Sequence, residues 1–415
     1  MTASLDAPPR DKAAAAGESV QRARELIPVL KERAVETEAL RRIPDATVAG
    51  LKAAQLHNLF TPVRYGGLEL DWPVHVDVGR EIARGCGSTA WFATVVLCNT
   101  WLLGRFPEKA QDEAWGENRD LVAASAFAGG NHLEPVDGGY RLNGLWRFSS
   151  GIDHADWVIL GATLGHHRPN EDSGPPEFRL ALVKRSEFEI IDNWYAAGLK
   201  GTGSKDVKVT GQFIPEYRTI ANASSTTDDP PGARLHESYI YGVEFLPYFR
   251  SLLLGPMLGA AHGAMEDYLS VTKSRIGMMF GESIVDQAPV QIRIAESALD
   301  LRCAEMLGRN VTGILARHGK EGRHLAGVKR INHVRDMAYI AQLCRRSVDR
   351  LASMMGASGQ TDNSPVQRHF RDVTAMAAHG SLQIDKAMSP YGRWALGLPT
   401  GDAAVDGIDE EAEAY

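Results

Sequence analysis

The sequence predicts an α+β protein, mainly α-helical, with one β-domain between two helical regions. Apolar residues follow a helical period up to about residue 120, alternate with polar residues over much of 121–220, and return to the helical period after Tyr239. We therefore expect an N-terminal helical domain over 17–120, a β-domain over 121–238 and a C-terminal helical bundle over 239–400.

The N-terminal region opens with a segment rich in alanine, proline and charge, so we expect residues 1–16 to form a flexible tail. A helix follows, because apolar side chains from Val20 to Ala34 recur on one face, and Pro44 followed by Asp45 restarts a second helix. Residues 74–103 return to the helical pattern and are unusually apolar, which indicates a helix buried between other elements.

The β-domain is marked by two alternating runs with Asn143-Gly144 between them. Asn-Gly between alternating runs is a strong hairpin signal, so we expect the chain to turn back at these two residues. Further strands are predicted over 156–164, 178–183 and 206–214.

The C-terminal region contains two long helical stripes of apolar residues, from Val290 to Leu301 and from Met337 to Leu351. Helices of this kind normally pack as an antiparallel bundle. The polar stretch 221–238 is predicted to be a loop or linker, and the acidic residues 401–415 a flexible tail.

Composition narrows the classes of protein. The 415 residues include 44% hydrophobic and 23% charged residues, and the formal net charge of −7 comes from interspersed acids and bases. Nucleic-acid and membrane surfaces need clustered Lys and Arg, so neither is expected. The chain shows no signal-peptide pattern, no apolar run of membrane length and four scattered cysteines, which together predict a cytoplasmic protein without a disulfide framework.

Several familiar sites are excluded by spacing. In GLKGTGSKD, which starts at Gly198, Ser204 separates Gly203 from Lys205, so the segment is no Walker loop, and it lacks the third glycine of a Rossmann loop. His369 and His379 have no acidic partner at metal-ligand spacing, so no metal site is expected. No GxSxG elbow is present.

Five segments resemble one family, in the same order along the chain. The flavin-dependent monooxygenases of the acyl-CoA dehydrogenase fold carry similar motifs, most of all the oxygenase components of two-component hydroxylases that act on a phenolic secosteroid or on p-hydroxyphenylacetate. The resemblance covers about residues 17–400, and the matching segments are GCGSTAW (85–91), GGYRLNGLWRFSSGIDHADW (138–157), WYAAGLKGTGSKDV (194–207), SPVQRHFRDV (364–373) and YGRWALGLP (391–399).

This resemblance implies a β-barrel as the middle domain and a homotetramer as the assembly. It also implies an activity. A separate NAD(P)H-dependent reductase would supply reduced flavin, FMNH2 or FADH2, and O2 would add to it as a C4a-hydroperoxyflavin. That species would hydroxylate a small aromatic, phenolic substrate.

The resemblance also assigns catalytic residues. Ser150 matches a serine beside flavin N5; Ser149 is the alternative, because successive strand residues face opposite ways. Ser125 matches a serine near the substrate. His379 follows Asp372 by seven residues, about two helical turns along one face, and matches a histidine that reaches the substrate hydroxyl. A base there would form the more nucleophilic phenolate.

Cofactor contacts are assigned in the same way. The indole of Trp91 would lie near the flavin ring, and Arg275 would bind the flavin phosphate. The other contacts are the glutamine of the QRxxRD motif, Gln367, and the backbone and hydroxyl groups of the glycine-rich loop, Gly201, Thr202, Gly203 and Ser204. Read without the resemblance, a core tryptophan, a plain β-turn and a surface salt bridge are the alternatives.

One position departs from the family. Close relatives commonly carry a second active-site histidine just before the tryptophan that is Trp101 here, whereas this chain has Asn99 and Thr100. Asparagine can form hydrogen bonds but cannot act as a base. We expect Asn99 and Trp101 to contact the substrate, whose identity the sequence leaves open.

Three alternatives remain. An acyl-CoA dehydrogenase would need a carboxylate base in the last helices, where this chain reads SPYGRWALG without a glutamate. Members of the same fold also oxygenate nitrogen or sulfur. A flavin carrier without activity is the third, because fold alone does not establish function.

Overall fold

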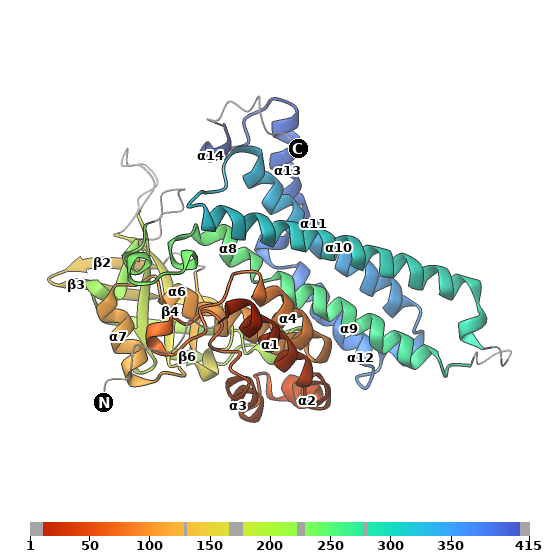
Figure 1. Cartoon of the computed structure of the whole chain (residues 1–415). Coiled ribbons are helices and arrows are strands. Elements are labelled where there is room, and N and C mark those ends of the chain that lie inside the picture. Colours follow the sequence, from red (N-terminus) through yellow and green to blue (C-terminus); the bar gives the residue numbers. More distant parts are fainter. Residues whose placement is uncertain are drawn as a thin grey trace.

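The computed structural model describes residues 11–127, 131–165, 177–221, 229–276, 281 and 283–406. Helices occupy the N-terminal part, strands the middle and long helices the C-terminal part (Figure 1). The β-domain forms one end of the molecule, and the C-terminal helices extend from it as an elongated arm (Figure 1). This is the order of parts that the sequence predicts.

The N-terminal helices are α1 (Lys12–Glu25), α2 (Ile27–Leu40), α3 (Asp45–Ala53), α4 (Val74–Gly85), α5 (Gly87–Trp91), α6 (Thr100–Leu103) and α7 (Glu108–Glu117). Helix α1 begins inside the expected tail, so that expectation is wrong for residues 12–16. The Asp11 side chain accepts hydrogen bonds from the backbone N–H groups of Ala13 and Ala14, and a run of alanines follows, which together favour a helix start. Residues 1–10 lie outside the described residues.

The buried segment from Gly87 to Leu103 does not wind uniformly. Between α5 and α6 the chain forms a π-helical turn at Phe92–Val96 and a 3₁₀ turn at Leu97–Asn99. Every residue of this segment except Val95 is buried. The prediction of one buried helix over 74–103 is therefore replaced by five helices or turns, and π turns are frequent at functional sites.

The β-domain consists of β1 (Ala123–Ala126), β2 (His132–Val136), β3 (Gly139–Ser149), β4 (Trp157–Leu164), β5 (Phe178–Lys184), β6 (Glu189–Ile191), β7 (Lys205–Pro215) and β8 (Thr219–Ala221). They form one sheet in the order β6-β7-β3-β2-β4-β5-β8, and β1 pairs with β4 in parallel. Within the described ranges no pairing joins β6 to β8, so hydrogen bonds leave two edges where a closed barrel was expected.

The predicted hairpin turn at Asn143-Gly144 is wrong. Both residues lie inside β3, which continues to Ser149, and Asn143 pairs with His132 of β2. The register of β3 against β7 shifts between Leu142 and Gly144, and the Asn143 side chain accepts a hydrogen bond from the Gly211 N–H. Asn-Gly therefore forms a β-bulge, and the chain turns between β2 and β3 instead.

The C-terminal helices are α8 (Phe245–Ser251), α9 (Leu254–Thr272), α10 (Ala288–Lys320), α11 (Gly327–Ser353), α12 (Pro365–Ala377), α13 (Ile384–Ala395) and α14 (Ala403–Asp406). Helix α9 packs closely against α4. A Cβ atom at Gly259 would lie 2.1 Å from the Arg80 carbonyl oxygen, so this crossing needs glycine.

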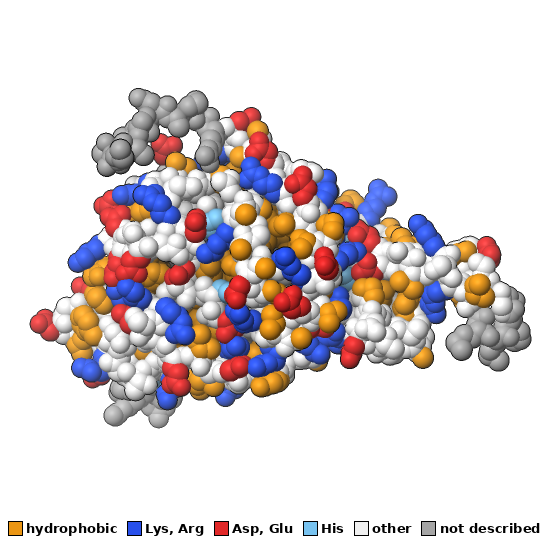
Figure 2. All heavy atoms as spheres, turned by 90° about the horizontal axis from the view of Figure 1, so that it is seen from below, with side chains coloured by type: hydrophobic (Ala, Val, Ile, Leu, Met, Phe, Trp, Pro, Cys, Tyr) orange, Lys and Arg blue, Asp and Glu red, His pale blue; other side chains and the backbone are white. Residues whose placement is uncertain are grey.

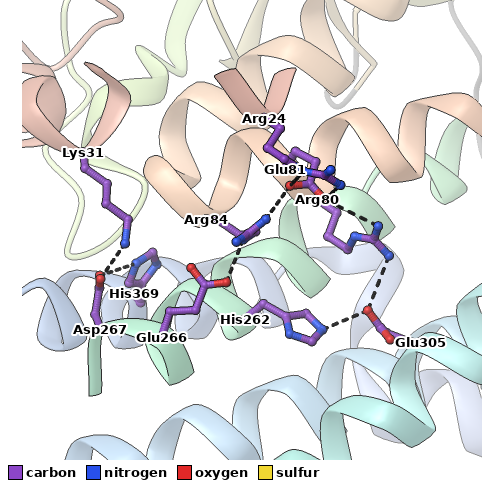
Figure 3. Close-up of polar contacts among 10 residues, drawn as sticks. All are labelled: Arg24, Lys31, Arg80, Glu81, Arg84, His262, Glu266, Asp267, Glu305 and His369. Carbon is purple, nitrogen blue, oxygen red and sulfur yellow. Dashed lines mark hydrogen bonds and ion pairs between the residues drawn. The ribbon is translucent and has the colours of Figure 1, made fainter. Parts of the chain in front are cut away.

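Ion pairs join α9 to its neighbours (Figure 3). Asp267 of α9 accepts from Lys31 of α2 at 2.6 Å and lies 3.3 Å from His369 of α12. Arg84 of α4 donates to Glu266 at 2.7 Å. These contacts fix α12 against the N-terminal helices, which matters because α12 carries residues that hold the candidate site.

The end of the described chain is not free. The Asp406 carboxylate accepts hydrogen bonds from the N–H groups of Thr400 and Gly401, and Asp402 lies 2.8 Å from Arg330 of α11. The expected flexible tail is therefore folded over residues 401–406, and 407–415 lie outside the described residues. Acidic side chains at this terminus find partners in the bundle.

Surface charge is mixed. Lys and Arg alternate with Asp and Glu over the face seen in Figure 2, with no field of one sign. Among the described residues, no helix is both long and apolar enough to cross a bilayer.

Candidate active site

A chain of hydrogen bonds connects three segments of the molecule. The indole N–H of Trp91 donates to Ser150 Oγ at 3.1 Å, and Ser150 Oγ lies 2.8 Å from Ser204 Oγ. Ser204 Oγ lies 2.7 Å from Thr202 Oγ1, which donates to the Leu199 carbonyl. All three hydroxyl-bearing residues are buried. The structure thus brings four of the predicted site residues together.

The end of β3 aims the two predicted serines apart. Phe148 has a left-handed φ of 63°, and the register against β7 shifts between Trp146 and Ser149. Ser149 donates to the Ser125 carbonyl at 3.4 Å, toward β1, whereas Ser150 faces Trp91 and Ser204. The bulge therefore gives each serine a different surrounding.

Gly151 must be glycine at this place. Its φ is 67°, and a Cβ atom would lie 2.7 Å from the Phe92 ring. Its N–H donates to the Thr202 carbonyl at 2.8 Å, which ties the end of β3 to the glycine-rich loop.

The loop from Gly198 to Ser204 is held by neighbours that the sequence did not single out. The Leu199 N–H donates to Asp372 Oδ1 at 2.6 Å, and the Gly201 N–H donates to Ser88 Oγ at 3.2 Å. Leu199 and Gly203 both have left-handed φ values. Asp372 belongs to the QRxxRD motif, so the motif carried a signal for it.

The Asp372 carboxyl is only 2% exposed, and burial raises its pKa to about 6. Glu38 raises this pKa further, whereas the Leu199 N–H, His369 and Arg371 lower it. A carboxylate held this deeply by a backbone N–H suits a positional role for the loop.

His379 does not lie on a helix as expected, because α12 ends at Ala377. It begins a 3₁₀ turn instead, and its Nδ1 accepts a hydrogen bond from the Ser381 N–H at 3.2 Å. The neutral ring must then carry its proton on Nε2, so it presents a donor. Burial first, and then the charge of Arg250, lower the pKa of His379.

The His379 ring centroid lies 5.7 Å from that of Trp91, so the predicted histidine and the hydroxyl chain share one site. His379, which follows α12, therefore lies close to Trp91 of α5, and Trp91 is bonded to Ser150 at the end of β3.

Asn99 is fully buried and connects to Ser125. Its Nδ2 donates to the Ala123 carbonyl at 2.9 Å and to Ser125 Oγ at 3.2 Å, while its Oδ1 is buried without a hydrogen-bond partner among the described residues. An unpaired buried acceptor is costly in a protein, so it marks a position for a donor from a ligand.

Trp101, which was expected to contact the substrate, lies in the core of the described structure. Its ring is fully buried, stacks on Phe245 with centroids 6.1 Å apart and meets Trp72 edge-on. Its indole N–H donates to the Ile240 carbonyl. Both its faces and its polar atom are therefore used by the core.

Two predicted cofactor contacts lie apart from the hydroxyl chain. Arg275 donates to the carbonyls of Met354 and Met355 at 3.2 and 3.1 Å, and the Gln367 side chain bonds to Arg371 and Thr361. Neither is hydrogen-bonded to Ser150, Thr202 or Ser204, so their roles at a flavin phosphate stay predictions.

A cavity of about 850 Å³ lies elsewhere, lined by residues that include Lys12, Glu69, Asp71 and Tyr239. It contains none of the predicted site residues. Within its wall, Lys320 and Tyr239 both bind Asp71.

Comparison with known proteins agrees with this geometry. Residues 19–118 match the model of the acyl-CoA dehydrogenase N-terminal domain, and residues 252–384 match that of the C-terminal domain. The chain is 33% identical over 383 residues to the flavin-dependent monooxygenase oxygenase subunit HsaA of Mycobacterium tuberculosis (strain CDC 1551 / Oshkosh), covering 92% of this chain and 95% of the relative. It belongs to the flavin-dependent monooxygenases of the acyl-CoA dehydrogenase fold.

Two further comparisons support this membership. The oxygenase is 31% identical to the p-hydroxyphenylacetate 3-hydroxylase oxygenase component of Acinetobacter baumannii, over 91% of this chain and 89% of that one. The crystal structure of the HsaA monooxygenase from M. tuberculosis superposes with a TM-score of 0.86 at 30% identity, covering 94% of this chain and all of that chain. The oxygenase is therefore an enzyme that uses reduced flavin and O2.

Proposed function

We propose that this oxygenase hydroxylates a small phenolic substrate and receives its reduced flavin, FMNH2 or FADH2, from a separate NAD(P)H-dependent reductase. The observation that carries the proposal is the hydrogen-bonded chain from Trp91 through Ser150 and Ser204 to Thr202, with His379 beside it. The two-component hydroxylases among the relatives support both the substrate class and the reductase.

These residues fit a flavin. Three buried hydroxyls converge beside an indole, which offers hydrogen-bond donors to the polar edge of an isoalloxazine ring and an aromatic face to its plane. The flavin, when bound, reduces O2 and delivers one of its oxygen atoms to the substrate. Ser150 is the proposed donor to flavin N5, and Ser204 and Thr202 orient that hydroxyl.

The substrate ring would lie between His379 and the Asn99–Ser125 pair. His379 Nε2–H donates to the substrate oxygen and stabilises its phenolate form, since Nδ1 is already used by the Ser381 N–H. This replaces the expected role as a base with a donor role. Asn99 Oδ1, which lacks a partner among the described residues, accepts from the substrate, while Asn99 Nδ2 donates to Ser125 Oγ.

The oxygenase is further proposed to act in the cytoplasm as a homotetramer. The four cysteines are free, and three of them are buried, which suits a reducing compartment. Exposed apolar side chains on α10, described below, support association.

Rapid mixing tests the proposed function. The protein, loaded anaerobically with reduced flavin, is mixed with O2 and followed by absorbance. A delay between O2 consumption and the return of oxidised flavin is expected, with product formed when a phenol is present. Immediate reoxidation to flavin and peroxide, with no product from any phenol, would contradict it.

A further inference from the structure

A row of aromatic rings leads from the candidate site toward the surface of the molecule. Trp101 stacks on Phe245, and the Phe245 ring lies 5.4 Å from that of Phe127, which follows Ser125 by two residues. Trp101 also meets the Trp72 ring edge-on, with centroids 4.8 Å apart. Both indoles are fully buried, so they form the inner part of the row.

Tyr239 forms the outer end of this row. Its hydroxyl accepts from the Trp72 backbone N–H at 3.4 Å and donates to the Asp71 carboxylate, which also binds Lys320 at 2.6 Å. Tyr239 is half-buried and lines the cavity of about 850 Å³, together with Asp71 and Lys320. Small molecules in solution can therefore reach the phenol, whereas the two indoles are closed to them.

The protonation states at this end suit a phenol that gives up its proton only when it is oxidised. Burial, and then the neighbouring Asp71, raise the pKa of Tyr239, so its hydroxyl stays protonated. Burial also acts to raise the pKa of Asp71, but the hydrogen bonds from Lys320 and Tyr239 lower it overall, so this carboxylate stays charged and can accept a proton. A phenol that loses one electron becomes a strong acid, and Asp71 is the base that its hydroxyl already contacts.

We propose that Trp101, Trp72 and Tyr239 form an electron-transfer path that removes stray oxygen radicals from the site. The enzyme brings reduced flavin and O2 together. Hydrogen peroxide that accepts one electron from reduced flavin splits into hydroxide and a hydroxyl radical. Oxidants damage cysteine and methionine side chains, and the buried thiol of Cys98 lies next to Asn99 in the site. This protective role is separate from the proposed hydroxylation of a phenol.

Electrons and protons balance along the path. The hydroxyl radical takes one electron from Trp101 and one proton from solvent and becomes water. Trp72 then reduces Trp101, and Tyr239 reduces Trp72 while its hydroxyl proton moves to Asp71, which leaves a neutral phenoxyl radical at the cavity. A small thiolate from solution gives one electron to this radical, and the proton returns from Asp71. The thiyl radicals from two such rounds join as a disulfide.

Electron paramagnetic resonance on rapidly frozen samples tests the path. The enzyme, with an excess of reduced flavin and without substrate or thiol, is mixed with O2 in the presence of catalase, which destroys peroxide that escapes into solution. A phenoxyl radical is expected in the wild type. Tyr239→Phe removes only the hydroxyl, and Trp72→Phe keeps a ring but removes the indole; both should lose this signal. Mass spectrometry should then find more oxidised cysteine and methionine in these two variants than in the wild type.

Tyr65→Phe is the matched control. Tyr65 donates to Asp112 at 2.7 Å and stacks on Trp115 with centroids 4.4 Å apart, so it has the same combination of phenol, carboxylate and indole. Its hydroxyl is bonded to Asp112 and not to Asp71, and it stacks on Trp115 and not on Trp72. This variant should therefore keep the wild-type radical and the wild-type level of oxidised side chains.

Three results would overturn the proposal: no phenoxyl radical in the wild type, a signal of wild-type size in Tyr239→Phe or Trp72→Phe, or a signal that Tyr65→Phe abolishes. Circular dichroism and flavin affinity check that each variant is folded, and Tyr239→Phe alone decides if Trp72→Phe is not. Because the radical is detected without substrate, a failure to hydroxylate phenols would count against the proposed function alone.

Discussion

The tautomer of His379 decides what this side chain can do at the site. Nδ1 accepts from the Ser381 N–H, so a neutral ring donates from Nε2 and has no free lone pair there. Burial and the charge of Arg250 keep its pKa below the ordinary value of 6.5, so the neutral form dominates at neutral pH. In this form the ring offers one N–H, from Nε2, to a substrate oxygen.

Substitution of His379 distinguishes donor from base. His379→Gln keeps a side-chain N–H and should retain much of kcat/KM for hydroxylation, whereas His379→Ala should lose roughly a hundredfold, toward the lower end of what a positioned catalytic group contributes. Product formation is measured from pH 6 to 9. A Gln variant as impaired as the Ala variant below the phenol pKa, and active above it, would restore the base role.

The wild-type profile should also fall in acid. Protonated His379 needs a hydrogen on Nδ1, which opposes the Ser381 N–H. Since the pKa of His379 is lower in the folded protein, the unfolded chain binds more protons below about pH 6.5. Protonation of this ring should therefore lower both the activity and the free energy of unfolding as pH falls.

Ser150 and Ser149 form a natural test pair. Ser150→Ala leaves the Trp91 N–H without its acceptor and interrupts the hydroxyl chain, so more reduced flavin should be oxidised without product. Ser149→Ala removes only a 3.4 Å contact and should change this coupling little. The measured quantity is the amount of product formed per flavin oxidised. Equal losses in the Ser150→Ala and Ser149→Ala variants would contradict a flavin contact of Ser150 alone.

At the scale of elements, the loop of 198–204 depends on α12. Asp372 holds the Leu199 N–H, and Leu199 in turn holds the hydroxyl of Thr202. The loop is therefore positioned by a helix that approaches from another part of the chain, and Asp267 and His369 help to fix that helix (Figure 3).

Asp372→Asn should change stability in a pH-dependent way. The folded pKa of about 6 exceeds the ordinary 3.8, so the wild type binds extra protons when folded and loses stability as pH rises between these values. The free energy of unfolding of the Asn variant, relative to that of the wild type, should rise by about 2 kcal/mol between pH 4 and 7.

Denaturant unfolding at both pH values measures this. Asn keeps an acceptor for the Leu199 N–H, so its flavin affinity should stay near that of the wild type, while Asp372→Ala should weaken it. A stability difference independent of pH would contradict the assignment of the raised pKa.

The local sequence pattern predicted the helices and strands better than it predicted the turns between them. The strands expected at 156–164, 178–183 and 206–214 are present as β4, β5 and β7, because alternation reports one buried face. The hairpin turn predicted at Asn143-Gly144 is absent, because β3 pairs with β2 on one side and β7 on the other, and the extra residue forms a β-bulge. Strand pairing on both sides therefore overrides the preference of a two-residue sequence for a turn.

The site was predictable in part for a similar reason. Ser150, Thr202, Ser204 and Trp91 lie in recognisable segments, and they do meet. The helical placement of His379 was wrong, because the end of α12 depends on packing between distant segments. The core position of Trp101 depends on such packing too.

At the scale of the whole molecule, α10 exposes an apolar stripe. Ile292, Leu299 and Met306 are spaced by seven residues and are 58%, 59% and 63% exposed. Such a heptad row is the seam of helix association. The arm that carries it projects from the rest of the molecule (Figure 1), which leaves it accessible to a second copy.

Leu299→Glu should therefore lower the oligomeric state. A carboxylate in a dehydrated helix seam is strongly unfavourable, so the proposed tetramer should dissociate to smaller species, measured by light scattering during size-exclusion chromatography. Leu145→Glu, at an exposed position of β3, is the matched control and should leave the mass unchanged. A mass equal to that of the wild type in Leu299→Glu would contradict an interface at this row of α10.

The π-helical turn at Phe92–Val96 has a consequence for how the site of such an enzyme can change in evolution. Each residue of a regular helix advances the next by about 100° around the axis, so losing one residue here would rotate everything after it. Cys98 or Thr100 would then face Ser125 in place of Asn99, and the side chain beside Ser125 would be exchanged by a change in length rather than in identity. Deleting Val95 tests this directly: the contact between Asn99 and Ser125 should be lost, while Trp91 and Ser150, which precede or lie outside the turn, stay together.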